Sequence, residues 1–242
     1  MKAVIIIPAR YESSRFPGKP LCKILGKSMI RHVWERCAQA LPADNVYIAT
    51  DDNRIKNHCV SQNMQVLMTG SECLTGTDRV YESSLQIESD IYINVQGDEP
   101  RIKPSDILAV FEEAKKKPGK IINAMCPITN EVDFRNVNVP KVVASPDGNL
   151  LYMSRAPIPT DKSLGFKIAK RQVCIYAFHG DALKALASYK EKTPLEKIED
   201  IEILRFLELG YSVQMVEVSG SSIAVDVPED VMKVEAVLNA RN

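Results

Sequence analysis

The chain has 242 residues, of which 45% are hydrophobic, so it can bury a substantial core in one large α/β domain or two small ones. Lysine plus arginine and aspartate plus glutamate each total 31, and this balance excludes a global basic field for nucleic acid or an anionic membrane. The first residues lack a secretory signal pattern, and no apolar run approaches the roughly 20 residues that span a bilayer. We expect a cytoplasmic protein without nucleic-acid or membrane partners, built as a single domain over 1–242 with an insertion around 125–178.

The first predicted element is a buried strand that ends in a cationic loop. Four consecutive β-branched residues, 4–7, suit a strand that helices cover on both faces of a parallel sheet. The run breaks at Pro8 into a loop that carries Arg10, Arg15 and Lys19. Ligands of open α/β sheets bind beyond the carboxyl ends of the strands, where this loop would lie. Its cations and free N–H groups suit a polyphosphate, although a solvated surface loop has a similar composition.

Alternating helices and strands follow. The elements expected next are a crossover helix over 29–41, a strand over 45–50, a helix from Arg54 and a short strand over 66–69. Asp51 and Asp52 lie at the carboxyl edge of the second strand. They could contact a ligand, but we favour capping of the helix that begins at Arg54.

Residues 74–80, LTGTDRV, have the pattern of a helix start. Thr75 and Gly76 would lie at an N-terminus whose exposed N–H groups attract an anion. Asp78 is also an ordinary acid of a first helical turn. Arg79 is more informative, because it would add a guanidinium to the anion-binding edge.

A second loop suited to ligand binding follows the strand predicted over 91–95. Gly97 turns the chain, and Asp98 and Glu99 come directly after it. Mg²⁺ is held by one or two carboxylates together with substrate phosphates, so a carboxylate that faces the basic loop predicts a magnesium–nucleotide site. A tight turn that caps the helix from Pro104 is the structural alternative.

From about residue 125 to 178 the alternation of strands and helices loosens, which marks the expected insertion. Alternating apolar residues over 137–143 and 173–178 predict antiparallel strands. A small sheet of this kind often forms an acceptor lid or a dimer surface. Arg155 lies on a segment stiffened by prolines and suits a carboxylate, either of a substrate or in a structural ion pair.

The C-terminal part predicts one amphipathic helix over 194–209. Glu199 and Glu202 lie three residues apart on adjacent turns, so both could reach one substrate, although a solvated charged face gives the same pattern. A strand over 212–218 then leads through a Gly-Ser-rich turn to Asp226 and a closing helix. Asp226 could share a metal with Asp98, or it could mark the helix entry.

Together these segments resemble the 3-deoxy-manno-octulosonate cytidylyltransferases, the CMP-Kdo synthetases, over nearly the whole chain. The motifs that carry the resemblance are PARYESSRFPGKPL, LTGTDR, NVQGDEP, LYMSRAPIP, PLEKIEDIEILR and VDVPED. The resemblance implies a Rossmann-related, nucleotide-diphospho-sugar transferase-like α/β fold with a mixed sheet and an antiparallel extension, usually in a homodimer. It implies the reaction CTP + Kdo → CMP-Kdo + pyrophosphate, with Mg²⁺ as cofactor, for lipopolysaccharide or capsule synthesis.

The resemblance also implies roles for individual residues. Lys19, Asp98 and Asp226 are expected to be catalytic, the two aspartates as ligands of Mg²⁺. The nucleotide set consists of Pro8, Ala9, Arg10, Arg15, Lys19, Thr75, Gly76, Arg79 and Gln96. The sugar set consists of Arg155, Gln172, Tyr176, Glu199 and Glu202. The anomeric hydroxyl of the sugar would attack the α-phosphorus of CTP, so catalysis is expected to depend mainly on positioning and charge stabilisation.

Two departures from the family pattern fall on the acceptor side. Gln172 stands where the family usually has histidine, and Ile203 replaces a glutamine thought to face the sugar. The acceptor is therefore open to a different ulosonic acid, such as 8-amino-Kdo or a nonulosonate. The competing classes are a non-catalytic CTP-binding protein and a nicotinamide-dependent oxidoreductase. The second is disfavoured because the first loop lacks G-x-G-x-x-G.

Overall fold

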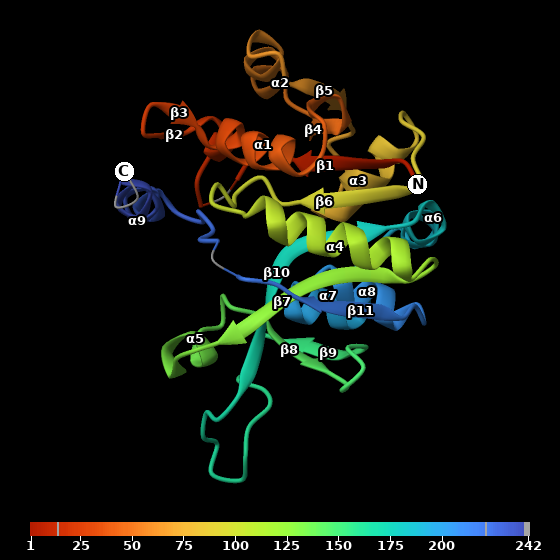
Figure 1. The fold of residues 1–242 in the computed structure, drawn as a ribbon, viewed down its shortest axis with the longest axis vertical. Coiled ribbons are helices and arrows are strands. Elements are labelled where there is room, and N and C mark those ends of the chain that lie inside the picture. The colour runs from red at the N-terminus through yellow and green to blue at the C-terminus, as the bar shows by residue number, and fades with distance from the viewer. Residues whose placement is uncertain (14, 221, 240–242) are drawn as a thin grey trace.

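The computed structural model describes residues 1–13, 15–220 and 222–239. Within these residues, a nine-stranded mixed sheet forms the centre of the molecule (Figure 1). Its main path has the spatial order β11 (Val213–Glu217), β7 (Ile121–Ile128), β10 (Ala169–Phe178), β6 (Ile91–Val95), β1 (Ala3–Pro8), β4 (Val46–Thr50) and β5 (Gln65–Met68). β1 runs parallel to β4 and β6, whereas β10 runs antiparallel to β6 and β7. The predicted mixed α/β sheet is thus confirmed.

Helices cover both faces of the sheet. Their bounds are α1 (Met29–Ala40), α2 (Asn53–Ser61), α3 (Gly76–Ser84), α4 (Pro104–Lys116), α5 (Glu131–Arg135), α6 (Gly180–Ser188), α7 (Pro194–Glu199), α8 (Ile203–Glu208) and α9 (Pro228–Asn239). Ile5 and Ile7 of β1 pack into a core with residues of α1, α2 and α4, and Val4 and Ile6 pack on the other face with residues of α3, α6 and α8. This double cover explains the unbroken apolar run of β1. In the described part of the chain, no helix has the length and apolar character needed to cross a membrane.

The carboxyl ends of β1, β4 and β6 share one edge of the sheet, because these strands are parallel. The C-terminal helix α9 returns to this edge, far from the start of β1 (Figure 1). Val225 and Val234 pack there against Ile24 of β2 (Lys23–Ile24) and Met29 of α1. β2 forms a small hairpin with β3 (Lys27–Ser28). The C-terminal segment therefore packs beside the hairpin and helix that follow the first loop.

The antiparallel extension lies at the start of β10, whereas the end of β10 pairs with β6 in the centre of the sheet. β8 (Lys141–Ala144) pairs with β10 and with β9 (Leu150–Ser154), and the loop between β9 and β10 projects away from the body (Figure 1). The strands predicted over 137–143 and 173–178 correspond to β8 and β10. β10 belongs to both parts, because its residues also pair with β6 in the centre of the sheet.

The prediction of one continuous helix over 194–209 is wrong, because the chain breaks between α7 and α8. Asp200 at the break has a φ of 50°, a left-handed conformation that aspartate tolerates better than most residues. The break turns Glu199 toward the segment after β9 and Glu202 toward the start of α3. Contacts with distant parts of the chain therefore replace the shared helix face that the spacing of these glutamates suggests.

Candidate active site

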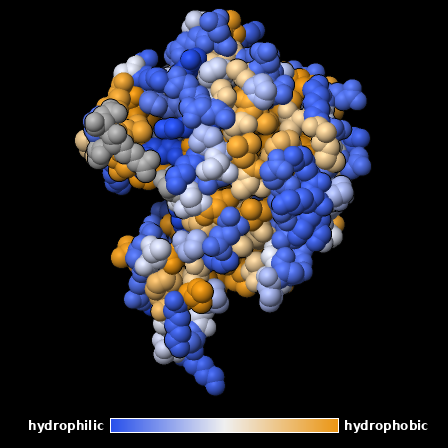
Figure 2. Space-filling model, in the orientation of Figure 1, coloured by the Kyte–Doolittle hydropathy of each residue, from blue (hydrophilic) through white to orange (hydrophobic). Residues whose placement is uncertain are grey.

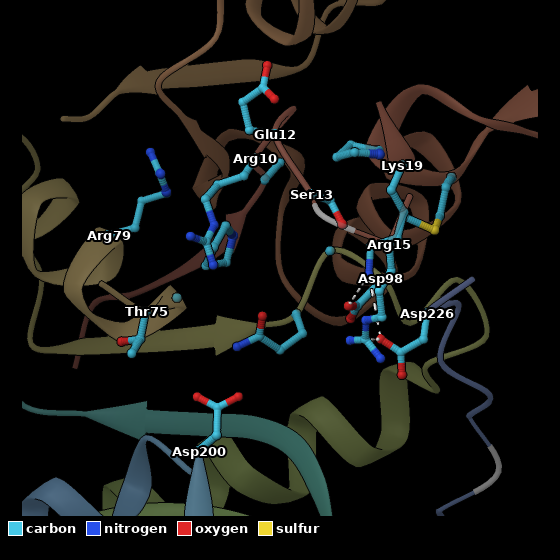
Figure 3. A pocket seen from close by; sticks show the side chains of 17 residues that line it. Arg10, Glu12, Ser13, Arg15, Lys19, Thr75, Arg79, Asp98, Asp200 and Asp226 are labelled. Atoms are coloured by element: carbon cyan, nitrogen blue, oxygen red, sulfur yellow. Dashed lines mark hydrogen bonds and ion pairs between the residues drawn. The ribbon is translucent and has the colours of Figure 1, made fainter. Parts of the chain in front are cut away.

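The loop after β1 brings a lysine between two carboxylates. Gly18 adopts a φ of 70°, which glycine reaches without a Cβ clash, and its N–H donates to the Tyr11 carbonyl at 2.8 Å. The short helix η1 (Lys19–Leu21) begins at this turn. The Lys19 ammonium lies 2.8 Å from Asp98 Oδ2 and 4.0 Å from Asp226 Oδ1 (Figure 3). Because its side chain is only 15% exposed, these interactions are poorly screened by water.

Asp98 and Asp226 come from distant segments that one backbone contact aligns. Asp98 follows β6, and Gly97 allows β6 to end close to β1, since a Cβ at Gly97 would lie 2.7 Å from the last carbonyl oxygen of β1. The Asp98 carbonyl accepts from the Val225 N–H at 2.9 Å. This bond places the segment before Asp226 beside the loop after β6. Both predicted metal ligands therefore reach the same edge.

Helix capping does not account for either carboxylate. The Asp226 N–H donates to the Asp230 carboxylate at 3.0 Å, so Asp230 serves the start of α9. The Asp226 carboxylate instead faces the loop after β1, with Oδ1 3.0 Å from Arg15 Nη2. The N-cap of α4 is Lys103, which leaves Asp98 outside that helix. Both carboxylates thus face cations of the first loop.

The start of α3 forms another wall of the cavity. The Thr75 side chain accepts from the Asp78 N–H, and the Asp78 carboxylate accepts from the Thr75 N–H at 2.7 Å, which is a reciprocal capping box. The positive end of the helix dipole lies at this turn. Arg79 is 1% exposed, and its Nη2 lies 3.3 Å from Asp51 Oδ2. The capping box and the ion pair of Arg79 with Asp51 therefore hold this wall in place.

These elements enclose a cavity of about 440 Å³, within the roughly 300–1,000 Å³ of small-molecule sites. All members of the nucleotide set line it, together with Asp98 and Asp226. Figure 3 shows Arg15 and Lys19 beside Asp98 and Asp226 in one part of the site, Thr75 and Arg79 in another, and Arg10 between them. The lining residues outside the predicted sets are Glu12, Ser13, Pro20, Met29, Gly97 and Asp200. Glu12, Ser13, Pro20 and Gly97 belong to the two predicted loops, whereas Met29 reaches the cavity from the start of α1 and Asp200 from the end of α7.

The carboxylate pair fits a hard divalent cation that shares its coordination with a substrate. Among the described residues, no group of three or more His, Cys, Asp and Glu side chains could hold a metal by itself. Mg²⁺ needs only one or two carboxylates when phosphates and water complete its coordination. Asp98 and Asp226 already share the positive charge of Lys19. They are the residues that could hold such an ion together with a nucleotide.

Arg155 and Glu199 of the sugar set lie beside each other. Glu199 Oε2 accepts from the Arg155 N–H at 2.8 Å, and Glu199 Oε1 accepts from the Ser154 hydroxyl at 2.6 Å. The Arg155 guanidinium donates to the backbone carbonyls of Val137 and Asp200, each at 3.0 Å. Neither residue belongs to the described lining of the cavity. Their binding of a sugar stays a prediction.

Gln172 and Tyr176 lie on β10 in a polar cluster with Asn123. Gln172 Nε2 donates to Asn123 Oδ1 at 3.0 Å and to the Tyr176 hydroxyl at 3.2 Å. Gln172 and Tyr176 are both buried. Burial raises the pKa of Tyr176 well above its ordinary value, so its hydroxyl stays protonated at neutral pH. The part of these two residues in sugar recognition also stays a prediction.

Glu202, the last member of the sugar set, is turned toward α3. Its Oε2 accepts from the Thr77 N–H at 3.1 Å, and its Oε1 accepts from Gln96 Nε2 at 3.2 Å. Desolvation raises the pKa of Glu202, and the Thr77 N–H opposes that rise. Glu202 therefore connects the segment between α7 and α8 to a residue that lines the cavity.

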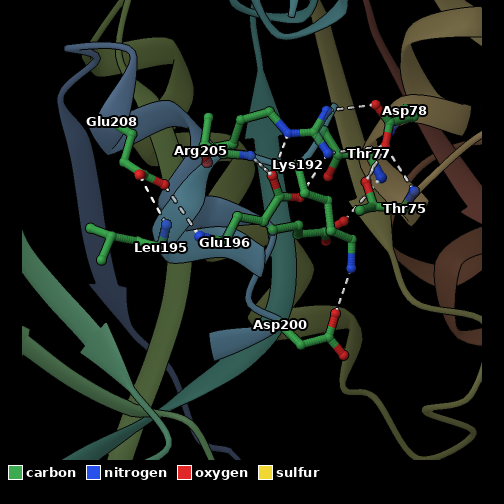
Figure 4. Close-up of polar contacts among 11 residues, drawn as sticks. Thr75, Thr77, Asp78, Lys192, Leu195, Glu196, Asp200, Arg205 and Glu208 are labelled. Atoms are coloured by element: carbon green, nitrogen blue, oxygen red, sulfur yellow. Dashed lines mark hydrogen bonds and ion pairs between the residues drawn. The ribbon is translucent and has the colours of Figure 1, made fainter. Parts of the chain in front are cut away.

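Arg205 is a functional candidate that the sequence reasoning missed. Its side chain is 0% exposed, with Nε 2.6 Å from Oε2 of the equally buried Glu196 and Nη1 2.8 Å from Asp78 Oδ1 (Figure 4). The sequence did contain a signal for it, an arginine inside the apolar run ILRFL. A cation buried in such a run requires carboxylate partners. Arg205 thereby joins α7 and α8 to the capped start of α3.

Comparisons with known proteins agree with this arrangement. The cytidylyltransferase family model matches residues 4–216. A 3-deoxy-manno-octulosonate cytidylyltransferase from Syntrophotalea carbinolica is 42% identical over 98% of this chain and 99% of its own length. An 8-amino-3,8-dideoxy-manno-octulosonate cytidylyltransferase from Shewanella halifaxensis is 39% identical over 98% of this chain and 99% of its own.

Structural comparison gives the same result. A solved CMP:2-keto-3-deoxy-manno-octonic acid synthetase in complex with CTP covers 100% of both chains, with 35% identity and a TM-score of 0.91. This likeness confirms the predicted nucleotide-diphospho-sugar transferase-like fold and removes the oxidoreductase alternative. With a family match over most of its length and full-length relatives at this identity, the chain belongs to the cytidylyltransferase family.

Proposed function

We propose that this cytidylyltransferase transfers CMP from CTP to Kdo and releases pyrophosphate. The observation that carries the proposal is the meeting of Arg15, Lys19, Asp98 and Asp226 at the carboxyl edge of the parallel strands. Cations at this edge suit a triphosphate, and paired carboxylates suit a divalent cation beside it. Full-length relatives that are 42% and 37% identical carry the name of this activity, which supports the choice of acceptor.

The reaction is an in-line displacement at the α-phosphorus of CTP. The anomeric hydroxyl of Kdo loses its proton to solvent and attacks, the bond between the α-phosphorus and the oxygen that leads to the β-phosphate breaks, and pyrophosphate leaves. Arg10, Arg15 and Lys19 offset the charge that builds on the departing phosphates. The start of α3 lines the same cavity, and the positive end of its helix dipole lies there. Positioning and charge stabilisation together supply the catalysis, as in other phosphoryl transfers.

Asp98 and Asp226 are the residues that would hold Mg²⁺. Bound there, the ion would lower the pKa of the attacking hydroxyl and neutralise phosphate charge. The two carboxylates supply oxygen donors, while the phosphates of CTP and water supply the others. Lys19 lies between the carboxylates in this structure, and it would turn to the phosphates of CTP.

A second acceptor, 8-amino-Kdo, is favoured by two departures on the acceptor side. Gln172 and Ile203 differ from the pattern expected for Kdo enzymes, and a 39% identical relative is named for the amino sugar. Gln172 contacts the Tyr176 hydroxyl, so an exchange at this position changes the hydrogen bonds available in that cluster. Kdo and 8-amino-Kdo differ in only one substituent of the sugar. The same pocket could therefore accept both, with only a small difference in kcat/KM between them.

Pyrophosphate release with CTP and Mg²⁺ tests the proposal across Kdo, 8-amino-Kdo and a nonulosonate. We expect the highest kcat/KM with Kdo and no release without an acid. Turnover of another acid without Kdo turnover would show that the acceptor is wrong. If CTP binds and no acid is turned over, the chain is a non-catalytic CTP-binding protein. Asp98→Asn is the control, since it should abolish turnover while leaving the fold intact.

We also infer that the chain forms a homodimer through the antiparallel extension. Exposed apolar side chains gather near α5 and the loop before β10, at Val132 (79% exposed), Val137 (62%), Leu164 (65%) and Ile168 (73%). Figure 2 shows hydrophobic residues on the surface of the lobe that contains this extension. Several large apolar side chains exposed on one small lobe are typical of an interface. Light scattering should give twice the chain mass for the wild type, and Ile168→Asp should lower it; a monomeric wild type would contradict the inference.

The proposed reaction also indicates a cellular setting. Its product would be the activated sugar for lipopolysaccharide or capsule assembly. CTP is a cytoplasmic substrate, so we place the enzyme in the cytoplasm. All six cysteines are free thiols, as expected in that reducing compartment. Cell fractionation that found the protein outside the cytoplasm would contradict this placement.

A further inference from the structure

Glu202 connects the acceptor-side helices to the wall of the nucleotide cavity, and both of its carboxylate oxygens are engaged. Oε2 accepts from the Thr77 N–H at 3.1 Å, in the first turn of α3. Oε1 accepts from Gln96 Nε2 at 3.2 Å. Thr77 is fully buried, and Gln96 lines the cavity. Glu202 thus stands behind a cavity residue rather than in the described lining itself.

The contact with Glu202 sets the orientation of the Gln96 amide. An ionised carboxylate can only accept hydrogen bonds, so the end of the amide that faces it must be the NH₂ group. Gly76 leaves room for the amide, because a Cβ at Gly76 would lie 2.8 Å from Gln96 Nε2. The amide therefore lies between a carboxylate and the backbone of α3. Its carbonyl oxygen is left on the side away from Glu202.

Arg205 keeps Glu202 in register with α3. Arg205 lies one helical turn beyond Glu202, and its Nη1 is 2.8 Å from Oδ1 of Asp78, the neighbour of Thr77 (Figure 4). The buried Glu196 holds the other side of the guanidinium, with 2.6 Å between Arg205 Nε and Glu196 Oε2. A shift of α8 relative to α3 would break these contacts together. Arg205 thus holds the start of α8, and with it Glu202, against the start of α3.

We infer that Glu202 is a positioning residue, which presents the Gln96 carbonyl oxygen to the cavity as an acceptor for a hydroxyl group of the sugar. Phosphate oxygens accept hydrogen bonds, so this carbonyl cannot serve the triphosphate. CTP has other donors in its ribose hydroxyls and cytosine amino group, and a rise in KM for CTP in Gln96→Ala without a rise in KM for the acid would assign the carbonyl to them and overturn the inference. Gln96 precedes Asp98 at the same strand end, which places its amide beside the reacting groups. The inference rests on the proposed function and deepens it. It gives Glu202 an indirect part in sugar binding in place of direct contact.

A double-mutant cycle between Glu202 and Gln96 separates the indirect role from direct contact. In Glu202→Gln the new amide still accepts from the Thr77 N–H, but it can also donate, so Gln96 loses its fixed orientation. We expect KM for the acid to rise about tenfold in this variant, the effect of one hydrogen bond, with kcat and KM for CTP within about twofold. Gln96→Ala should raise KM for the acid at least as much. The double variant should show no loss beyond that of Gln96→Ala.

Glu208→Gln is the matched control, because it makes the same exchange on α8. Glu208 accepts from the Leu195 N–H at 3.0 Å and is not part of the described cavity lining, so its variant should keep both KM values. Losses that add in the double variant would show that Glu202 contacts the sugar directly. An unchanged KM for the acid in Glu202→Gln would also overturn the inference.

The exchange of the Gln96 side-chain amide with solvent is a second readout that needs no acid. Its NMR signals can be assigned by their loss in Gln96→Ala. We expect slow exchange in the wild type and exchange at least about tenfold faster in Glu202→Gln, since the hydrogen bond protects the NH₂ group. If no acid is turned over by the wild type, the proposed function fails, but this measurement still stands. Equal exchange rates in the two proteins would overturn the positioning role.

Discussion

Replacing Arg205 with methionine should destabilise the protein strongly. Arg205 and Glu196 are both 0% exposed, and Asp78 gives the guanidinium its second carboxylate at 2.8 Å. Methionine fills much of the same space but leaves Glu196 buried without its cation. Breaking a buried ion pair in this way costs about 3–5 kcal/mol. In a domain of this size, each kcal/mol lowers Tm by about 2–4 °C, so we expect Tm to fall by roughly 10 °C.

Urea unfolding and thermal unfolding measure this effect against a matched control. Arg135→Met removes an exposed ion pair with Glu131, whose side chains are 48% and 57% exposed, and should change stability by less than about 0.5 kcal/mol. The double variant Arg205→Met with Glu196→Leu should recover more than half of the loss, because it removes the buried charge. A loss below about 1 kcal/mol in Arg205→Met, or one equal to that of Arg135→Met, would refute the reasoning.

Three further predictions concern the first loop, the end of β6 and pH. Lys19→Met should lower kcat/KM for CTP about 10- to 100-fold, the contribution of a charge-assisted contact, while Mn²⁺ titrated into the free protein and followed by electron paramagnetic resonance should bind more tightly. Gly97→Ala should destabilise the protein in urea by about 1–3 kcal/mol, because its Cβ would lie 2.7 Å from a carbonyl oxygen of β1. Hydrogen bonds from Arg54 lower the pKa of Asp52, so its stabilisation should be present above the unfolded pKa of about 3.9 and be lost as pH falls through the folded value. Thermal unfolding between pH 7 and pH 2.5, with Asp52→Asn as control, measures that loss.

Each of these predictions has an outcome that contradicts it. Mn²⁺ binding that is equal in the wild type and Lys19→Met would show that the ammonium does not compete for the carboxylates. A Gly97→Ala variant as stable as the wild type would show that β6 and β1 can separate without loss. Stability of Asp52→Asn that falls as steeply in acid as that of the wild type would remove Asp52 from the pH dependence.

The clustering of the predicted nucleotide residues around one cavity could be anticipated because these residues directly follow predicted elements. The loop after β1 and the capped start of α3 each carry their ligand-facing residues within a short stretch, and strand pairing alone brings these stretches together. Asp98 and Asp226 needed the family resemblance as well, because the sequence pattern left capping open for both. The contact of Lys19 with both carboxylates then follows from the shared edge.

The acceptor side was less predictable because its polar side chains are used by distant partners. Glu202 contacts Thr77 across 125 positions, and Arg205 contacts Asp78 across 127. Helical spacing reports only on residues three or four positions apart. It therefore predicted one helix with Glu199 and Glu202 on a common side. The left-handed residue Asp200 ends α7 and makes those long-range contacts possible. Periodicity contains no signal for such a break.

The ³¹P NMR spectrum of a reaction with CTP, Kdo and Mg²⁺ tests most directly whether this site joins CMP to the sugar. We predict a new phosphodiester resonance of a CMP-sugar that grows in equal amount with pyrophosphate, requires Mg²⁺, and is absent with Asp98→Asn and Asp226→Asn. CMP and pyrophosphate without the phosphodiester, or unchanged CTP with every ulosonic acid, would contradict it.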